Sequence, residues 1–91
     1  MKLGDSTTKE KVTARLRRIE GQVRGVEKMV AEDRDCHEIL QQLNSIHSAV
    51  QSTSKMFLQE VAADCLLNSD TIDLSKRKQV LEEMLDLIGK V

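Results

Sequence analysis

Apolar positions in the first third of the chain recur in alternating steps of four and three residues, the spacing of a heptad seam. The seam consists of Val12, Leu16, Ile19, Val23, Val26 and Val30. Just before it, "TTKE" at residues 7–10 has the form of a capping box, with Thr7 as the N-cap and Glu10 at the third helical position. The pattern predicts a packed helix from about Thr7 to Val30.

A second helix is predicted after the polar stretch "EDRD", in which Asp33 or Asp35 can act as the N-cap. The seam then continues at heptad spacing through Ile39, Leu43, Ile46, Val50 and Phe57. We expect this helix to run from Cys36 to about Leu67, which is roughly 45 Å at 1.5 Å per residue. A helix of that length cannot be covered by two shorter helices of the same chain, so the pattern predicts a partner chain.

A third helix is predicted after the turn "NSDTIDLS", with its N-cap at Thr71 or Asp73 and its end at Gly89. Its apolar positions are Val80, Leu81, Met84, Leu85 and Ile88. The predicted fold class is therefore all-α, with three helices in one domain that spans residues 1–91. Gly21 and Gly25, one turn apart in the first helix, favour close packing of a neighbouring helix over a functional hinge.

Composition points to the same need for partner chains. The chain has one Phe, no Trp and no Tyr, while 40% of its residues are hydrophobic and 32% are charged. Large aromatic anchors of a monomeric core are thus missing, and the apolar stripes must be buried elsewhere. No apolar run of about 18 residues and no signal-peptide segment is present, so we expect a cytoplasmic protein without a membrane partner.

Basic charge is concentrated near the start of the chain. Residues 1–28 carry eight Lys and Arg against four Asp and Glu, whereas residues 29–91 carry six against eleven. The candidate DNA contacts are Lys11, Arg15 and Arg18 along one edge of the first helix, Gln22 extending that edge, Arg17 on another edge, and Lys55 on the second helix. Such residues suit the phosphates of double-stranded DNA, and the lack of interleaved aromatic residues disfavours single strands. Charge alone leaves a solvated helix face equally open.

The two cysteines, Cys36 and Cys65, lie 29 residues apart, near the two ends of the predicted second helix. They share one face but are separated by about eight turns, or roughly 43 Å, so they cannot meet within one chain. Antiparallel pairing of two copies about a two-fold axis near Val50–Gln51 brings Cys36 opposite Cys65 of the second copy. The alternative is that each cysteine is a small buried hydrophobic residue.

Four segments carry a resemblance to a known family: "RLRRIEGQVRGVEKMV", "DCHEILQQLNSI", the "DC" at the end of the second helix, and "LEEMLDLI". Across nearly its whole length the chain resembles the copper-sensing operon repressor (CsoR/RcnR/FrmR) family of bacterial transcriptional repressors. The resemblance implies an antiparallel dimer with a four-helix core, a homotetramer of two dimers, and an inducer site between subunits. It also implies operator DNA binding, for which Arg15 is the first candidate and Arg18 and Gln22 the next.

The resemblance leaves the inducer open. Copper-sensing members place a His ligand one turn before the second Cys, and here that position is Val61. His37 follows Cys36 directly and points about 100° away from it, which favours a surface role. His47 lies about three turns from Cys36 and about five from Cys65, and is interpreted as a packing or interface residue. Glu83 falls where copper-sensing relatives place an acid that supports the metal ligands, although a solvated helix charge explains it equally well.

Two thiols without the His resemble the persulfide-sensing, CstR-like branch of the family. We therefore predict that reactive sulfur links Cys36 and Cys65 across the dimer as a di-, tri- or tetrasulfide, with no cofactor required. The alternative is Cu(I) held by the same two thiolates, and another oxidant or electrophile is a third option. The sequence has no paired catalytic carboxylates, Gly-rich phosphate loop or C-x-x-C motif, so it does not predict an enzyme. A thiol oxidoreductase and a helical adaptor without a DNA role remain as remote alternatives.

Overall fold

The computed structural model describes residues 6–68 and 74–89, with side chains for residues 6–63 and 75–87. The described residues form three α-helices and no strand, which confirms the predicted all-α class. The helices are α1 (Ser6–Ala31), α2 (Cys36–Asn68) and α3 (Leu74–Gly89). The predicted end of the second helix at Leu67 is one residue short, and the predicted end of the third at Gly89 is confirmed.

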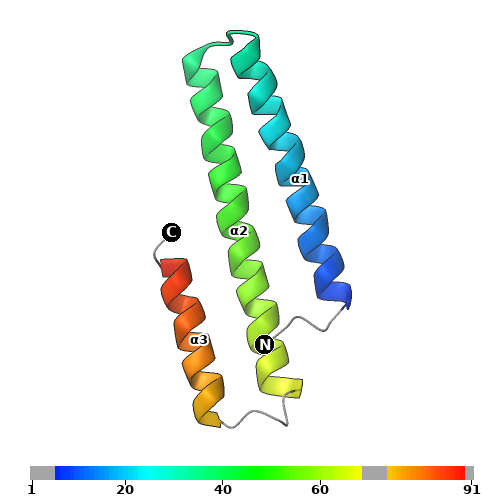
Figure 1. The fold of residues 1–91 in the computed structure, drawn as a ribbon, viewed down its shortest axis with the longest axis vertical. Coiled ribbons are helices and arrows are strands. Elements are labelled where there is room, and N and C mark those ends of the chain that lie inside the picture. The colour runs from blue at the N-terminus through cyan, green and yellow to red at the C-terminus, as the bar shows by residue number, and fades with distance from the viewer. Residues whose placement is uncertain (1–5, 69–73, 90–91) are drawn as a thin grey trace.

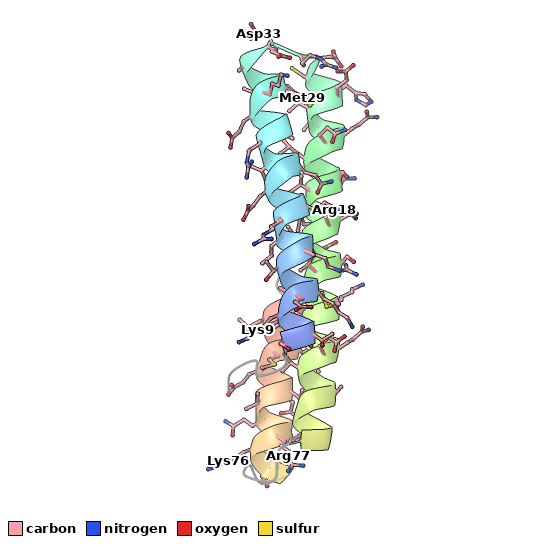
Figure 2. The ribbon with its side chains drawn as sticks, turned by 90° about the vertical axis from the view of Figure 1, so that its right-hand side faces the viewer. Lys9, Arg18, Met29, Asp33, Lys76 and Arg77 are labelled. Carbon is pink, nitrogen blue, oxygen red and sulfur yellow. The ribbon has the colours of Figure 1, made fainter. Side chains whose placement is uncertain are left out.

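The three helices lie side by side, with α2 between α1 and α3 (Figure 1), and in the view turned by 90° α2 is displaced to one side of the other two (Figure 2). α1 runs antiparallel to α2 along one flank, and α3 packs along the C-terminal half of α2 on the other. The molecule measures 55 × 27 × 13 Å along its principal axes, and its radius of gyration is 17.1 Å. A compact chain of this length would have a radius of gyration of about 12 Å. Three helices arranged in this way have no enclosed interior, so each helix has a face that its own chain leaves open.

α1 ends in a Schellman turn that reverses the chain. The Arg34 N–H donates to the Met29 carbonyl at 2.9 Å, and the Asp33 N–H donates to the Val30 carbonyl at 3.2 Å. Asp33 supplies the left-handed residue of this turn, with φ of 53°. Glycine is the usual residue there, and Asp is one of the few others that tolerate this backbone conformation.

Asp35 begins α2. Its Oδ2 accepts the backbone N–H groups of His37 at 3.1 Å and Glu38 at 3.4 Å, the pattern of an N-cap. Of the two predicted caps, Asp35 is therefore confirmed, and Asp33 belongs to the end of α1. The turn joining the two helices is short, which holds α1 and α2 as antiparallel neighbours; Figure 2 shows Asp33 at its tip.

The caps predicted for the first and third helices are not confirmed. α1 begins at Ser6, so Thr7 lies inside its first turn and the prediction of Thr7 as N-cap is wrong. Helix starts are the least certain part of a sequence pattern, because several adjacent polar residues can cap. The predicted caps of the third helix, Thr71 and Asp73, lie outside the described residues.

The seams of α1 and α2 each divide into two rows with different surroundings. We call the row that faces the other helix of the hairpin the inner row; its members are buried or half-buried. The inner row consists of Val12, Ile19 and Val26 on α1 and Ile39, Ile46 and Thr53 on α2. The neighbouring row, here the outer row, is exposed throughout. It consists of Leu16, Val23 and Val30 on α1 and Leu43, Val50 and Phe57 on α2.

Gly21 and Gly25 are exposed on α1, and a Cβ built on either would meet no atom within 4 Å apart from the helix's own backbone. The prediction that they admit a closely packed neighbouring helix is therefore wrong within this chain. Each glycine removes about 0.5–1 kcal/mol from the stability of a helix relative to alanine.

None of the helices in the described part of the chain combines the length and the apolar character that a membrane span requires.

Candidate DNA interface and sensing site

The basic edge of α1 meets α2 at a small notch. Arg15 is exposed, and its Nη1 donates to the Ser52 hydroxyl on α2 at 3.1 Å. Arg15, Arg18 and Ser52 line a hollow of about 300 Å³, together with Ile19, Ala49 and Thr53. The wall is thus part guanidinium and hydroxyl, and part aliphatic. Two guanidinium groups and a hydroxyl suit a phosphate oxygen, because all three can donate hydrogen bonds to it.

Further along the same edge, Lys11 is joined to α2 by a carboxylate. The Lys11 Nζ lies 3.4 Å from Glu60 Oε1, and the Thr8 hydroxyl donates to Glu60 Oε2 at 3.4 Å. The side chains of Lys11 and Glu60 are 55% and 32% exposed, whereas Thr8 is 2% exposed. One carboxylate therefore touches a buried hydroxyl and a solvent-facing ammonium of the other helix.

The remaining predicted DNA contacts do not gather at one place. Gln22 is half-buried between the helices, and its Oε1 is buried without a hydrogen-bond partner. Arg17 is exposed on α1, and Lys55 is exposed on α2, one turn after Ser52. In Figure 2, Arg18 lies at the border between α1 and α2, in agreement with its place beside the notch.

The two cysteines occupy the ends of α2. Cys36 is the first residue of the helix and is an exposed free thiol. Cys65 lies near the C-terminal end of the same helix, and its side chain is outside the described part. Because α2 is continuous between them, the two positions are about 43 Å apart along the axis. The two thiols cannot meet within one chain.

The residues predicted to flank the thiols have distinct surroundings. Val61, one turn before Cys65, is 5% exposed and is one of the two buried hydrophobic residues in the described part of the chain. Glu83 is exposed on α3, where its Oε1 accepts from Gln79 Nε2 at 3.4 Å, one turn away. This contact fits the solvated helix charge that the sequence left open.

Both histidines are exposed on α2. The His37 ring nitrogen Nε2 lies 3.3 Å from Gln41 Nε2, so His37 interacts one turn along its own helix. Within the described residues, no group of three or more His, Cys, Asp and Glu side chains is arranged to hold a metal ion.

Sequence patterns had not predicted a role for Glu60, Thr8 or Ser52. Ile39, Ile46 and Thr53 follow one another at seven-residue steps in the inner row, and the next step along α2 is Glu60. A carboxylate in a row that faces a basic helix is a signal for a cross-helix contact. No comparable sequence signal identifies Ser52.

Comparisons with known proteins converge on one family. Residues 8–90 match the family described as metal-sensitive transcriptional repressor. The chain is 38% identical over 85 residues to the copper-sensing transcriptional repressor CsoR of Bacillus subtilis, covering 93% of this chain and 82% of that protein. It is 38% identical over 63 residues to the copper-sensing transcriptional repressor RicR of Mycobacterium tuberculosis, covering 69% and 66%. Among solved structures, the nickel-responsive transcriptional regulator InrS superposes with a TM-score of 0.77 at 31% identity, covering 87% of this chain and 90% of that one.

Proposed function

The chain belongs to the family of metal-sensitive transcriptional repressors, and on this premise we propose that it binds operator DNA as an oligomer and is released by thiol chemistry at Cys36 and Cys65. The match over residues 8–90 carries the proposal. The family consists of transcriptional repressors and not of enzymes, so a thiol oxidoreductase or a simple adaptor no longer competes with this function.

The outer row supports self-association. In the single chain, Leu16 is 46% exposed, Leu43 47% and Val50 41%. A hollow of about 440 Å³ opens between the three helices, and its walls include Leu16, Val50 and Phe57 of the outer row and Met84 of α3. Contiguous apolar surface of this kind marks an interface. A second copy of the α1–α2 hairpin, related by a two-fold axis, fills it with the same residues and forms a four-helix core. Two such dimers form the homotetramer that the resemblance implies.

Operator binding is assigned to the basic edge of α1. Arg15 is oriented by Ser52, and Arg18 shares the same notch. Phosphate contacts of this kind, repeated by symmetry over an oligomer, give duplex binding that weakens steeply with salt. Arg17, Lys55 and Gln22 remain candidate contacts outside the notch.

Sensing is assigned to the sites where Cys36 of one subunit faces Cys65 of another. An antiparallel dimer about an axis near Val50–Gln51 contains two such sites. Val61 supports reactive sulfur as the inducer, because an apolar, 5% exposed side chain occupies the position of the histidine ligand in copper-sensing relatives. Thiol–sulfur exchange needs two thiols and no third ligand.

The exchange is balanced without an external oxidant. One cysteine thiolate attacks the sulfane sulfur of a persulfide, RS–SH, and forms Cys–S–SH with release of RSH. The thiolate of the second cysteine then attacks Sγ of the first, the S–S bond of the persulfide breaks, a disulfide forms between subunits and H₂S leaves. If both cysteines carry persulfide, attack of one on the other forms a trisulfide and again releases H₂S. The covalent link favours a dimer conformation with lower DNA affinity.

Cu(I) is the second candidate inducer, because two of the similar repressors are named as copper-sensing. The thiolates of Cys36 and Cys65 suit this soft ion. They would hold it in linear two-coordinate fashion, without the third ligand that a histidine at position 61 would supply.

DNA binding by reduced, persulfide-treated and Cu(I)-loaded protein, compared side by side, tests the function. The probe is the duplex upstream of the protein's own coding sequence, with a mixed-sequence duplex as control. We expect tight binding by the reduced protein and release by persulfide, together with a Cys36–Cys65 inter-subunit peptide in mass spectrometry. A tight stoichiometric Cu(I) complex that releases DNA, with no such peptide, would establish copper instead. No binding to either duplex would refute the repressor assignment.

Arg15→Ala tests the DNA interface. Loss of the guanidinium at the notch should abolish operator binding, because the phosphate contact is lost at every symmetry-related copy. The oligomer should remain intact, since Arg15 is exposed and lies outside both apolar rows. Fluorescence anisotropy and sedimentation velocity measure the two properties; wild-type affinity in the variant would remove Arg15 from the interface.

A further inference from the structure

Glu60 is a carboxylate of α2 that acts on the basic edge of α1. It lies 3.4 Å from Lys11 and accepts the Thr8 hydroxyl at the same distance. The pairs Glu20–Arg24, Lys28–Glu32 and Arg34–Glu38 differ in kind, because each joins residues four apart in sequence. Glu60 is 49 residues from Lys11 in sequence, so its pair with Lys11 exists only because α1 and α2 pack together.

We propose that Glu60 competes with the DNA backbone for Lys11 and thereby sets the strength of DNA binding. This inference rests on the proposed function as a DNA-binding repressor. Lys11 lies one turn before Arg15 on the edge that carries the notch, so its ammonium is placed to reach a phosphate next to the one at Arg15. Phosphate and carboxylate are both acceptors for the Lys11 ammonium, and a carboxylate beside it repels an approaching phosphate.

The solvent exposure of Lys11, Glu60 and Thr8 is consistent with a DNA phosphate taking the place of Glu60 beside Lys11. Lys11 is 55% exposed, so its ammonium remains accessible from solvent while it is paired. Ion pairs as exposed as this one stabilise a fold only weakly, and exchange of partners is correspondingly easy. Thr8, by contrast, is 2% exposed. Its hydroxyl lies 3.4 Å from Oε2 of Glu60, so the carboxylate has a second contact with α1 besides Lys11. Glu60 is therefore a positioning residue and not itself a DNA contact.

The substitution Glu60→Gln removes the competing charge and retains an oxygen that accepts the Thr8 hydroxyl. We expect the variant to bind the upstream duplex about three-fold to ten-fold more tightly than the wild type. The logarithm of its affinity falls linearly with the logarithm of the salt concentration, and this slope should become more negative by about 0.9 for every Lys11 that gains a phosphate contact. A purely structural role for Glu60 would lower the melting temperature without steepening this slope.

Three further variants separate this competition from a general change of charge. Glu10→Gln removes the same charge from an exposed position next to Lys11 and should leave both the affinity and the slope close to those of the wild type. Lys11→Gln should weaken binding, and adding Glu60→Gln to it should restore nothing, because the residue for which Glu60 competes is gone. Circular dichroism melts at one protein concentration verify that all four proteins fold.

The outcomes distinguish the inference from the function on which it rests. If wild type binds the duplex and Arg15→Ala does not, while Glu60→Gln behaves as wild type, the competition is wrong and the repressor assignment stands. If Glu60→Gln raises the DNA affinity equally in the presence and absence of Lys11, the inference is also overturned, because the effect then comes from a non-specific change of charge. If the wild type binds neither the upstream nor the mixed-sequence duplex, the repressor assignment itself fails.

Discussion

The inner and outer rows of the α1–α2 hairpin are built from similar residues and have opposite surroundings. In the inner row Val26 is 8% exposed, whereas Val30, one turn further along α1 in the outer row, is 56% exposed. On α2, Thr53 of the inner row is 8% exposed, and Val50 of the outer row is 41% exposed. The buried Thr53 hydroxyl donates to the Ala49 carbonyl at 2.8 Å, so the hydroxyl of the one polar residue in the inner row has a hydrogen-bond partner within the chain.

The comparison shows how a small chain divides its limited apolar surface. The inner row joins two helices of one chain, while the outer row is exposed and is the surface that we propose for a second copy. In this chain of 91 residues without Trp or Tyr, much of the apolar seam is therefore left outside the core of the single chain. Most of its stability is therefore expected to come from association, and substitutions in the two rows should have separable effects.

The largest effect is expected from Val50→Glu in the outer row. A carboxylate in the centre of an apolar interface, next to its own symmetry copy, costs several kcal/mol, so self-association should weaken by at least about 100-fold. Sedimentation velocity over a concentration series measures this loss. Ser48→Glu, which adds the same charge at another exposed position of α2, is the control and should associate as the wild type does. Normal association of Val50→Glu would show that the outer row is not the interface.

A smaller effect is expected from Val26→Ala in the inner row. Removing two buried methyl groups should lower the free energy of unfolding by about 1–3 kcal/mol and leave the oligomeric state unchanged. Val30→Ala, the same substitution one turn away in the outer row, should instead act mainly on association. Sedimentation velocity over a concentration series measures association, which only Val30→Ala should weaken, and urea unfolding of both variants at one protein concentration measures the loss of stability. Equally weakened association in both variants would contradict the division into two rows.

The smallest effect is expected from Gly25→Ala, on a face of α1 that belongs to neither row. A methyl group there meets no atom of another element within 4 Å. Only the higher helix propensity of alanine should therefore change the stability, and the free energy of unfolding should rise by about 0.5–1 kcal/mol. Thermal unfolding followed by circular dichroism measures the change. Destabilisation of the assembled protein would contradict this expectation and show that another subunit packs against Gly25.

The helices were predictable from sequence because helical period, caps and turn residues act locally. The end of α2 at Asn68 is one residue beyond the prediction, and its cap at Asp35 was one of two candidates. The choice between Asp33 and Asp35 was not predictable, because both are polar residues in the same turn. It depends on which aspartate takes the left-handed conformation that ends α1, and Asp33 does so.

The candidate site was only partly predictable. Arg15 and Arg18 follow from the charge pattern of one helix, and Cys36 and Cys65 from their places at the ends of another. The partners of the basic edge, Ser52 and Glu60, lie 37 and 49 residues from the side chains that they contact. Such contacts depend on the register of α1 against α2, which the pattern of a single helix does not contain. The burial of Gln22 Oε1 was not predictable for the same reason, and its role as a DNA contact stays a prediction.

By itself, then, the sequence determined three helices, a basic first helix and two thiols that no single chain can bring together, and from these it predicted partner chains. These features depend on residue type and on spacing along one helix, which the covalent chain specifies directly. Only the tertiary structure decided which apolar row lies inside the subunit, which arginine is held by a serine, and which lysine is held by a glutamate. Those choices depend on the rotation and register of one helix against another, where a shift of one residue turns each side chain by about 100°.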